Sequence, residues 1–456
     1  MRRELLRYLD FWRVSKRRKP LIIKGARQVG KTYVLKTWGQ ASFPRVHYIN
    51  FEKNTAAARS FERDFDVNRI LNELSFNLDT SIVPATDLLI FDEIQACPKA
   101  MTALKYFCED MPQLAVACAG SLLGVILSPE SFPVGKVQFL HLRPMSFPEF
   151  LNEVDTRRSL DHLPAPSIEA YIHASIPDVI HEHLWDLLRI YYVTGGMPEA
   201  VSILADSRVL GTPKLRMVLD EVRSTQRSIV SSYENDFAKH AGNVNATHIH
   251  ALYHNIPSQL ASVHDESIRR FQFGAVIPGK KGFAAWERPV QWLKNAGLAC
   301  QIKIVNHAEL PLEHFTKPNM FKLIPHDVGL LGCMLDLPPS VLMSQDFGMA
   351  KGYFAEVYVA QAILAAAPAD KDQQLYGWSE GESEIEFLVS SERGPVPVEV
   401  KSGRRTKARS LGQYISKYKP EFAICLSMKP WSWAADRRLL NLPLPLAHCI
   451  GSLTPI

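Results

Sequence analysis

The sequence has few cysteines, little net charge and no long hydrophobic run, and each shortage excludes a class of protein. Its seven cysteines are odd in number and include no C-x-x-C pair, which excludes a disulfide framework and a cysteine zinc site and favours a reducing compartment. No stretch approaches the roughly 20 apolar residues of a membrane span. The net charge of +5 does not by itself indicate a nucleic-acid partner. We therefore expect a cytoplasmic protein without a membrane partner.

The chain is long enough for several domains, and its first part predicts an α/β fold. It has 456 residues, of which 46% are hydrophobic and 22% charged, as in folded proteins of two to four domains. Short apolar runs alternate with helical stretches at residues 21–23, 46–51, 88–91, 114–117 and 137–140. Strands that are apolar throughout are typical of a parallel sheet covered by helices on both faces. We therefore predict a parallel-sheet domain at residues 1–142.

The remaining sequence predicts three further regions. Helical periodicity dominates residues 143–243, with a turn at 195–198. Residues 244–345 combine helices with a strand at 299–305, which suits a winged-helix-like bundle. Residues 346–456 predict, in order, a helix, three strands, a helix and a strand. The predicted bounds are therefore 1–142, 143–243, 244–345 and 346–456.

The segment from Gly25 to Thr32 matches the pattern G-x-x-x-x-G-K-[ST] between a predicted strand and a predicted helix. Backbone N–H groups of such a loop point at phosphates, at the positive end of the following helix. Lys31 would bind the β- and γ-phosphates of ATP, and the Thr32 hydroxyl would hold Mg²⁺. The predicted nucleotide-binding residues are Gly25, Ala26, Arg27, Gln28, Val29, Gly30, Lys31 and Thr32.

An acidic pair about 60 residues later completes this predicted site. Four apolar residues precede Asp92 and Glu93, so Asp92 would lie at the carboxyl end of a strand. There Asp92 could hold Mg²⁺ through water, while Glu93 could orient or deprotonate the attacking water. Ser121 could contact the γ-phosphate or that water, but an ordinary turn residue explains it equally well. Arg27 and Arg143 are candidates for an arginine finger.

These motifs resemble a family of prokaryotic AAA-type ATPases of largely unknown function, with a helical middle and a C-terminal restriction-endonuclease-like domain. The matching segments are residues 25–32, 91–95, 120–121, 143–150, 195–200, 256–260, 291–298 and 327–331, so the resemblance covers nearly the whole chain. It implies an ASCE-type P-loop domain with Glu93 as the catalytic glutamate. It implies no substrate, because the family itself is poorly assigned.

The last predicted domain carries a second group of charged residues. Twelve residues separate Glu386 from Glu399, enough for a hairpin, and the period of two puts Glu399 and Lys401 on one face of a strand. The group looks like the PD-(D/E)xK nuclease pattern, with Glu356 on the preceding helix as a further acid. Its carboxylates would hold one or two divalent ions, while Lys401 would stabilise charge or position water. Glu386 stands where Asp is usual, which could displace the metal.

Two hypotheses follow for the whole chain. In the first, ATP hydrolysis drives or licenses metal-dependent action on DNA or RNA, using a second Mg²⁺ or Mn²⁺ ion. In the second, the chain is a nucleotide-gated switch whose C-terminal domain binds DNA or a protein without cleaving it. The two differ in whether Glu386, Glu399 and Lys401 converge on a divalent ion. A kinase is disfavoured because Glu93 adjoins Asp92, and a homo-oligomer is left open.

Basic clusters and histidine pairs receive plainer interpretations. Eight Lys or Arg side chains in residues 1–19 are interpreted as the solvated face of a helix, with phosphate contact as the alternative. A second basic cluster occupies residues 401–409. The histidine pairs 181/183 and 250/254 have no third ligand at suitable spacing. We therefore interpret them as solvated or buried histidines rather than as metal ligands.

Overall fold

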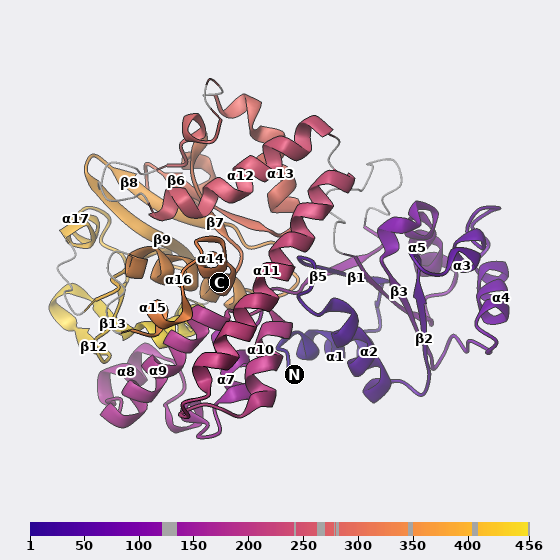
Figure 1. Ribbon diagram of the computed structural model, residues 1–456, viewed down its shortest axis with the longest axis horizontal. Helices are drawn as coiled ribbons and strands as arrows, with labels where there is room; N and C mark the ends of the chain where they lie inside the picture. The colour runs from indigo at the N-terminus through magenta and orange to yellow at the C-terminus, as the bar shows by residue number, and fades with distance from the viewer. Residues whose placement is uncertain are drawn as a thin grey trace. The chain divides into compact units, whose positions relative to one another are not determined.

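The computed structural model describes residues 1–120, 135–240, 243–261, 270–277, 279, 282–344, 350–403 and 409–454. The chain divides into two compact units (Figure 1). Unit 1 comprises Met1–Arg143, Asn295–Gly297 and Pro368–Asp372, and unit 2 comprises Pro144–Lys294, Leu298–Ala367 and Gln373–Ile456. Among the helices described, not one combines the length and apolar character needed to cross a bilayer.

Unit 1 is built on a five-stranded sheet in which every neighbouring pair of strands is parallel. The order is β2-β3-β4-β1-β5, so the phosphate-loop strand β1 lies between two strands that are far from it in sequence. The predicted α/β fold with a parallel sheet is confirmed. The strands are β1 (Leu21–Lys24), β2 (Val46–Asn50), β3 (Leu88–Asp92), β4 (Ala115–Ala119) and β5 (Gln138–His141).

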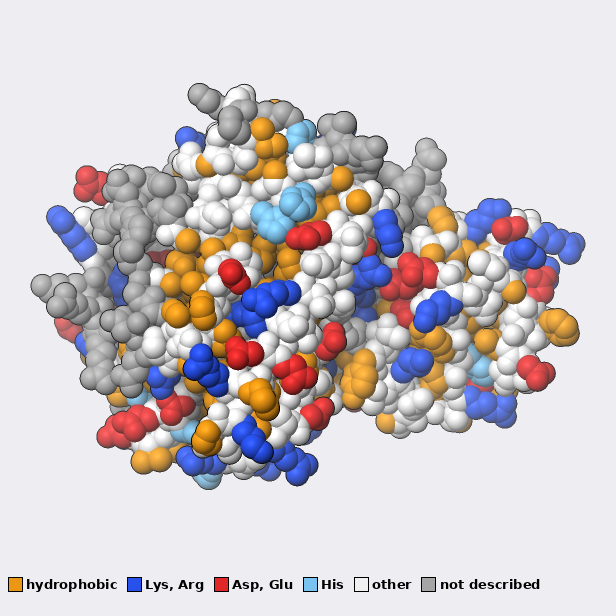
Figure 2. Space-filling view, in the orientation of Figure 1, with side chains coloured by type: hydrophobic (Ala, Val, Ile, Leu, Met, Phe, Trp, Pro, Cys, Tyr) orange, Lys and Arg blue, Asp and Glu red, His pale blue; other side chains and the backbone are white. Residues whose placement is uncertain are grey.

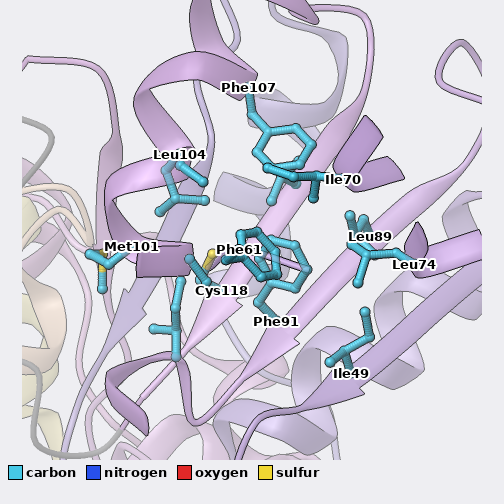
Figure 3. Packing of buried hydrophobic residues seen from close by; sticks show 14 of the residues in the cluster. Ile49, Phe61, Ile70, Leu74, Leu89, Phe91, Met101, Leu104, Phe107 and Cys118 are labelled. Carbon is cyan, nitrogen blue, oxygen red and sulfur yellow. The ribbon is translucent and has the colours of Figure 1, made fainter. Parts of the chain in front are cut away.

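Helices cover this sheet and bury its apolar side chains. The core of unit 1 joins Ile49, Leu89 and Phe91 of the sheet to side chains of the covering helices, including Leu104 and Phe107 (Figure 3). Every residue of β3 is buried, which explains why this strand is a continuous apolar run in the sequence. The helices are α1 (Leu5–Val14), α2 (Lys31–Ser42), α3 (Thr55–Arg59), α4 (Val67–Asn77), η1 (Ile94–Ala96) and α5 (Pro98–Asp110).

Two short late segments complete unit 1. The backbone N–H of His141, on the edge strand β5, donates to the carbonyl of Ala369 at 2.7 Å. Gly297, with φ of +74°, lies so close to the phosphate loop that a Cβ there would be 3.1 Å from the amide nitrogen of Ala26. Unit 1 is therefore assembled from three separate stretches of the chain.

Unit 2 contains the helical middle of the chain. Three of the segments that carry the family resemblance, residues 143–150, 195–200 and 327–331, meet in the core of unit 2 at Asp327. The fully buried Asp327 carboxylate accepts hydrogen bonds from the amides of Gly196 (2.7 Å) and Leu330 (3.0 Å). The amide of Met145 in turn donates to the carbonyl of Gly196 at 2.6 Å. These segments therefore organise the fold of unit 2.

Helices fill much of residues 143–243, as predicted, and continue through the rest of unit 2. They are α7 (Phe147–Val154), η3 (Ser159–His162), α8 (Ile168–His173), α9 (Asp178–Thr194), α10 (Pro198–Ser207), α11 (Leu215–His240), α12 (Asn243–Ala261), η4 (Phe273–Ala275), η5 (Phe283–Ala285), α13 (Glu287–Asn295), η6 (Leu312–Phe315), α14 (Val328–Met334), α15 (Pro339–Met343), α16 (Ala350–Ala366), α17 (Arg409–Tyr418), η7 (Ala435–Arg437), η8 (Leu444–Cys449) and α18 (Ile450–Leu453).

The strands of unit 2 form a mixed sheet of order β12-β13-β11-β10-β9-β8-β6-β7. The strands β6 and β7 come from the region expected to be winged-helix-like, but they extend the C-terminal sheet, because β6 pairs in parallel with β8. The predicted succession of helix, three strands, helix and strand is present as α16, β8, β9, β10, α17 and β11. The strands are β6 (Ala299–Val305), β7 (Thr316–Pro325), β8 (Leu375–Glu380), β9 (Ser383–Ser391), β10 (Gly394–Val400), β11 (Ala423–Ser427), β12 (Ser432–Ala434) and β13 (Leu439–Pro443).

Candidate functional site

The loop between β1 and α2 has the backbone that its glycines predict. Gly25 has φ of +155°, and a Cβ there would come within 2.1 Å of the carbonyl oxygen of Leu142. Gly30 has φ of +93° and immediately precedes the first residue of α2, in a left-handed conformation that side chains disfavour. The loop therefore presents the positive end of α2 to its own concave side.

Lys31 lies inside this loop rather than in solvent. Its ammonium donates to the carbonyl oxygens of Gly25 (2.9 Å) and Ala26 (2.7 Å), and only 7% of the residue is exposed. Burial lowers the pKa of Lys31 to about 8, and the charges of Glu93 and Asp92 only partly oppose this lowering. A buried ammonium with backbone partners is suited to bind an anion that enters the loop.

Asp92, at the end of β3, brings the second motif against the first. The Thr32 hydroxyl donates to its carboxylate, at 3.1 Å from Oδ1 and 3.0 Å from Oδ2. The Tyr48 hydroxyl donates to Oδ2 at 2.6 Å, and burial, followed by this hydrogen bond, raises the pKa of Tyr48 to about 12. Asn50 pairs with Asp92 in the β2–β3 register and lies 3.4 Å from Oδ2. Sequence analysis did not identify Tyr48 or Asn50, although both lie in the strand predicted at residues 46–51.

Glu93 adopts an unusual backbone conformation. Its φ and ψ are 48° and 47°, in the left-handed region that non-glycine residues seldom occupy and that is enriched at functional sites. The Gln95 side chain donates to its carboxylate at 2.5 Å, so Glu93 is held in place by a residue of the same motif. Ser121, the other predicted residue near the γ-phosphate, lies outside the described residues.

Arg3 is a contact of the loop that sequence analysis missed. It is 5% exposed, and its guanidinium donates to the carbonyl oxygens of Val29 (3.0 Å) and Arg143 (2.5 Å). The interpretation of the N-terminal basic cluster as a solvated face is therefore wrong for Arg3, although Arg7 and Arg13 are exposed. Arg3 ties the phosphate loop to the end of the first stretch of unit 1.

Comparison with family models identifies the kind of domain that carries these residues. Residues 17–151 match the AAA domain. This part of the chain is thus an AAA-type P-loop ATPase domain, with the phosphate loop and the acidic pair of the AAA domain both inside the matched range. Two domains of unknown function match residues 186–341 and 351–445. A search of curated proteins finds no match.

Solved structures show a distant similarity. The Walker-type ATPase PABY2304 of Pyrococcus abyssi is 13% identical, with 74% of this chain and 95% of that chain covered and a TM-score of 0.46. The Orc1 protein of Aeropyrum pernix, solved in complex with DNA, is 13% identical over 75% and 95% of the chains, with a TM-score of 0.30. A RuvB variant of Thermotoga maritima is 11% identical over 70% and 91%, with a TM-score of 0.34. Similarity this distant assigns no activity or partner to this chain.

Unit 2 contains a cavity of about 590 Å³, and the residues of the predicted nuclease-like group, Glu356, Glu386, Glu399 and Lys401, line it. Glu386, on β9, and Glu399, at the end of β10, both line it. Burial, followed by the charge of Glu399, raises the pKa of Glu386 well above its usual range. Burial likewise raises the pKa of Glu399, although Lys401 opposes this increase. The charge of Glu399 therefore disfavours ionisation of Glu386, whereas a side-chain hydrogen bond with Glu386 lowers the pKa of Glu399.

Cations of the protein already lie within this cavity. The Lys401 ammonium is 2.5 Å from Glu399 Oε1. Lys322, on β7, was not identified from the sequence, and its ammonium lies 3.2 Å from Glu356 and 2.5 Å from Glu384. The Lys322 ammonium is therefore placed where a bound cation would otherwise balance these acids.

The three predicted metal ligands of unit 2 do not gather as one group. Over the described ranges, the ligand atoms of Glu356, Glu386 and Glu399 do not all lie within 4.8 Å of one another. The backbone amide of Val400 donates to Glu386 Oε2 at 3.0 Å. In contrast, Oε2 of the almost fully buried Glu399 has no hydrogen-bond partner among the described residues. Glu386 and Glu399 together fit one ion better than Glu356 does.

Proposed function

We propose that the AAA domain binds Mg²⁺-ATP and hydrolyses it. The observation that carries this proposal is the contact of Thr32 with Asp92, because the hydroxyl and the carboxylate that hold Mg²⁺ in P-loop ATPases meet here at 3.0 Å. Lys31, already inside the loop, would exchange its carbonyl partners for the β- and γ-phosphates. The residues present therefore fit both the nucleotide and the ion.

Each residue has a defined task in this proposal. The loop amides and Lys31 bind and orient the phosphates, and Thr32 and Asp92 hold the ion. Mg²⁺, when bound, neutralises charge on the β- and γ-phosphate oxygens. Glu93 orients water and accepts its proton, while Gln95 keeps the Glu93 carboxylate in position.

The test separates binding from turnover. Glu93→Gln should bind ATP as the wild type does but lose hydrolysis by on the order of 10²–10⁴-fold, the usual contribution of a general base. The matched control is Glu52→Gln, which changes an exposed glutamate of the same domain and should leave turnover intact. Wild-type turnover in Glu93→Gln would show that another group activates the water.

A second function is favoured by the unpartnered Oε2 of Glu399. We infer that the cavity of unit 2 holds one Mg²⁺ or Mn²⁺ between Glu386 and Glu399 and takes a phosphodiester of DNA or RNA, with Lys401 stabilising the developing charge. A buried carboxylate oxygen without a donor is unfavourable, and a divalent ion would satisfy it. The nucleotide state of the AAA domain would then license this action, in a monomer or a homo-oligomer.

The experiment must keep the sheet of unit 2 intact and silence the ATP site. The full chain with Asp92→Asn serves as background, because residues 346–456 alone would lack β6 and β7. Calorimetry with Mn²⁺ should show binding that is lost when Glu399→Gln or Glu386→Gln is added, while Glu382→Gln, an exposed acid at the cavity rim, should retain it. Loss of nucleic-acid cleavage in Lys401→Ala would support catalysis. Absence of Mn²⁺ binding even with nucleic acid present would leave the non-cleaving switch as the function of unit 2.

A further inference from the structure

A second cluster of ligand-type side chains lies on the helical part of unit 2, and none of its residues lines the carboxylate cavity. Glu234 of α11 and His250 and His254 of α12 each offer a ligand atom, and these atoms all lie within 4.8 Å of one another. The His254 Nε2 and Glu234 Oε1 atoms are 2.8 Å apart, with 40% and 30% of the two side chains exposed. Histidine side chains gather next to an acidic one on this face (Figure 2).

The interpretation that His250 and His254 lack a third ligand is therefore wrong. The two histidines are four residues apart, which places them on one face of a helix. Their ring centroids are 4.4 Å apart. The third ligand comes from the preceding helix, a relation that spacing within α12 cannot reveal.

The packing beneath the cluster holds the two helices in register. Phe237 lies one turn after Glu234 on α11, and Tyr253 directly precedes His254 on α12. Their rings meet edge to face with centroids 5.5 Å apart, and each residue is 1% exposed. The ligand-bearing turns are therefore fixed relative to each other by a buried contact, as a preorganised site requires.

We propose that Glu234, His250 and His254 bind a divalent transition-metal ion of the Zn²⁺ class. Two imidazole nitrogens and one carboxylate oxygen are the donor set of tetrahedral zinc sites with one position open to water. Mg²⁺ and Ca²⁺ prefer oxygen donors, so this site is chemically distinct from the proposed ion sites of the AAA domain and of the cavity. Zn²⁺ bound here would join α11 to α12.

A simple ion pair between His254 and Glu234 is the competing explanation. Such a pair, partly exposed to solvent, contributes little to stability, and it gives no role to His250. A shared metal ion accounts for all three side chains, because it draws two neighbouring imidazoles and a carboxylate toward one point. The contribution of His250 is therefore the feature that distinguishes the two explanations.

The experiment uses the full chain without a histidine tag. Co²⁺, a spectroscopic substitute for Zn²⁺, should give visible absorption bands of a tetrahedral site that Zn²⁺ abolishes by competition. His250→Ala, His254→Ala and Glu234→Gln should each weaken binding by at least the roughly 10–100-fold that loss of an outer-shell partner causes. His173→Ala, which removes an exposed histidine of unit 2 outside the cluster, should bind as the wild type does.

Two results would overturn the proposal. The first is wild-type Co²⁺ and Zn²⁺ affinity in His250→Ala, which would reduce the cluster to the ion pair of His254 with Glu234. The second is the absence of these bands in the wild-type protein. Circular dichroism of each variant separates loss of a ligand from loss of the fold, and Zn²⁺-dependent protection of α11 and α12 in hydrogen exchange gives a second readout. Protection that persists in His254→Ala would also refute the site.

Discussion

Raising the pH from 7 to 9 should weaken ATP binding by about tenfold, because Lys31 loses its proton over this range. The pKa of Lys31 in the nucleotide-free protein is about 8, lowered by burial against the opposing charges of Glu93 and Asp92. About nine tenths of the molecules therefore carry a charged Lys31 at pH 7 and about one tenth at pH 9. Bound phosphates favour the charged form. Above pH 8, binding must therefore be accompanied by uptake of a proton.

Calorimetry with a non-hydrolysable ATP analogue can measure both effects. Titrations at pH 7, 8 and 9, each in two buffers of different ionisation enthalpy, give the affinity and the number of protons taken up. Uptake should rise from near zero at pH 7 toward one at pH 9. Tyr48, the other perturbed group in contact with Asp92, has its pKa raised to about 12 and does not titrate in this range.

The variant Glu93→Gln and the pH dependence of the stability of the fold test the same reasoning. Glu93→Gln removes a charge that raises the pKa of Lys31, so the midpoint of the pH dependence should move to lower pH. The lowered pKa of Lys31 also has a defined effect on stability. The unfolded chain holds more protons than the native protein between pH 8 and 10.5, so the nucleotide-free fold should gain stability as the pH rises through that window. Constant affinity from pH 7 to 9, or proton release on binding, would refute the argument.

Three further predictions concern stability. Arg3→Ala should lower the free energy of unfolding of the nucleotide-free protein by about 3 kcal/mol. The reason is that the buried guanidinium donates two charge-assisted hydrogen bonds, which contribute about 1.5–3 kcal/mol each before relaxation. A change below about 0.5 kcal/mol in urea unfolding would contradict this prediction. Glu93→Gly should abolish turnover yet stabilise the fold by about 1 kcal/mol, since glycine tolerates φ of 48°, whereas an unchanged denaturation midpoint would show no strain. Lys322→Met should lower the free energy of unfolding by about 3–5 kcal/mol, because it leaves Glu356 and Glu384 without their shared cation. Mn²⁺ should restore part of this stability. Wild-type stability of the variant would refute the role of Lys322.

The features that the sequence predicts well are those encoded by neighbouring residues. Strands β3 and β4 are buried along their whole length and are almost entirely apolar in sequence, because helices cover the sheet. The phosphate loop is a contiguous motif with fixed spacing. Lys31, Thr32 and Asp92 therefore come together as expected. In the last region the elements from α16 to β11 were also predicted, because the patterns that mark them are local, whereas β12, β13 and the short helices after β11 were not predicted.

The contacts that sequence analysis missed join residues distant along the chain. Arg3 reaches the carbonyl oxygen of Arg143, 140 residues later, and Lys322 reaches Glu356, 34 residues later. The residues next to Arg3 and Lys322 in the sequence do not distinguish them from solvent-exposed basic residues. The same holds for Glu234, whose partners belong to another helix, and for β6, whose pairing with β8 is a property of the whole sheet. Arg404, Arg405 and Lys407, which belong to the basic cluster at residues 401–409, lie outside the described residues.

The segment that follows α16 has a consequence for biosynthesis. The backbone N–H of His141, on the edge strand β5 of the AAA sheet, donates a hydrogen bond to Ala369, whereas the contiguous part of this unit ends at Arg143. A ribosome that adds roughly 5–20 residues per second needs about 10–50 s to travel from residue 143 to residue 372. During that interval the edge strand β5 lacks the contact with Ala369, and a strand of another chain could pair with it. A chain truncated after residue 143 would lack Ala369, and its edge strand β5 would remain available for pairing with other chains.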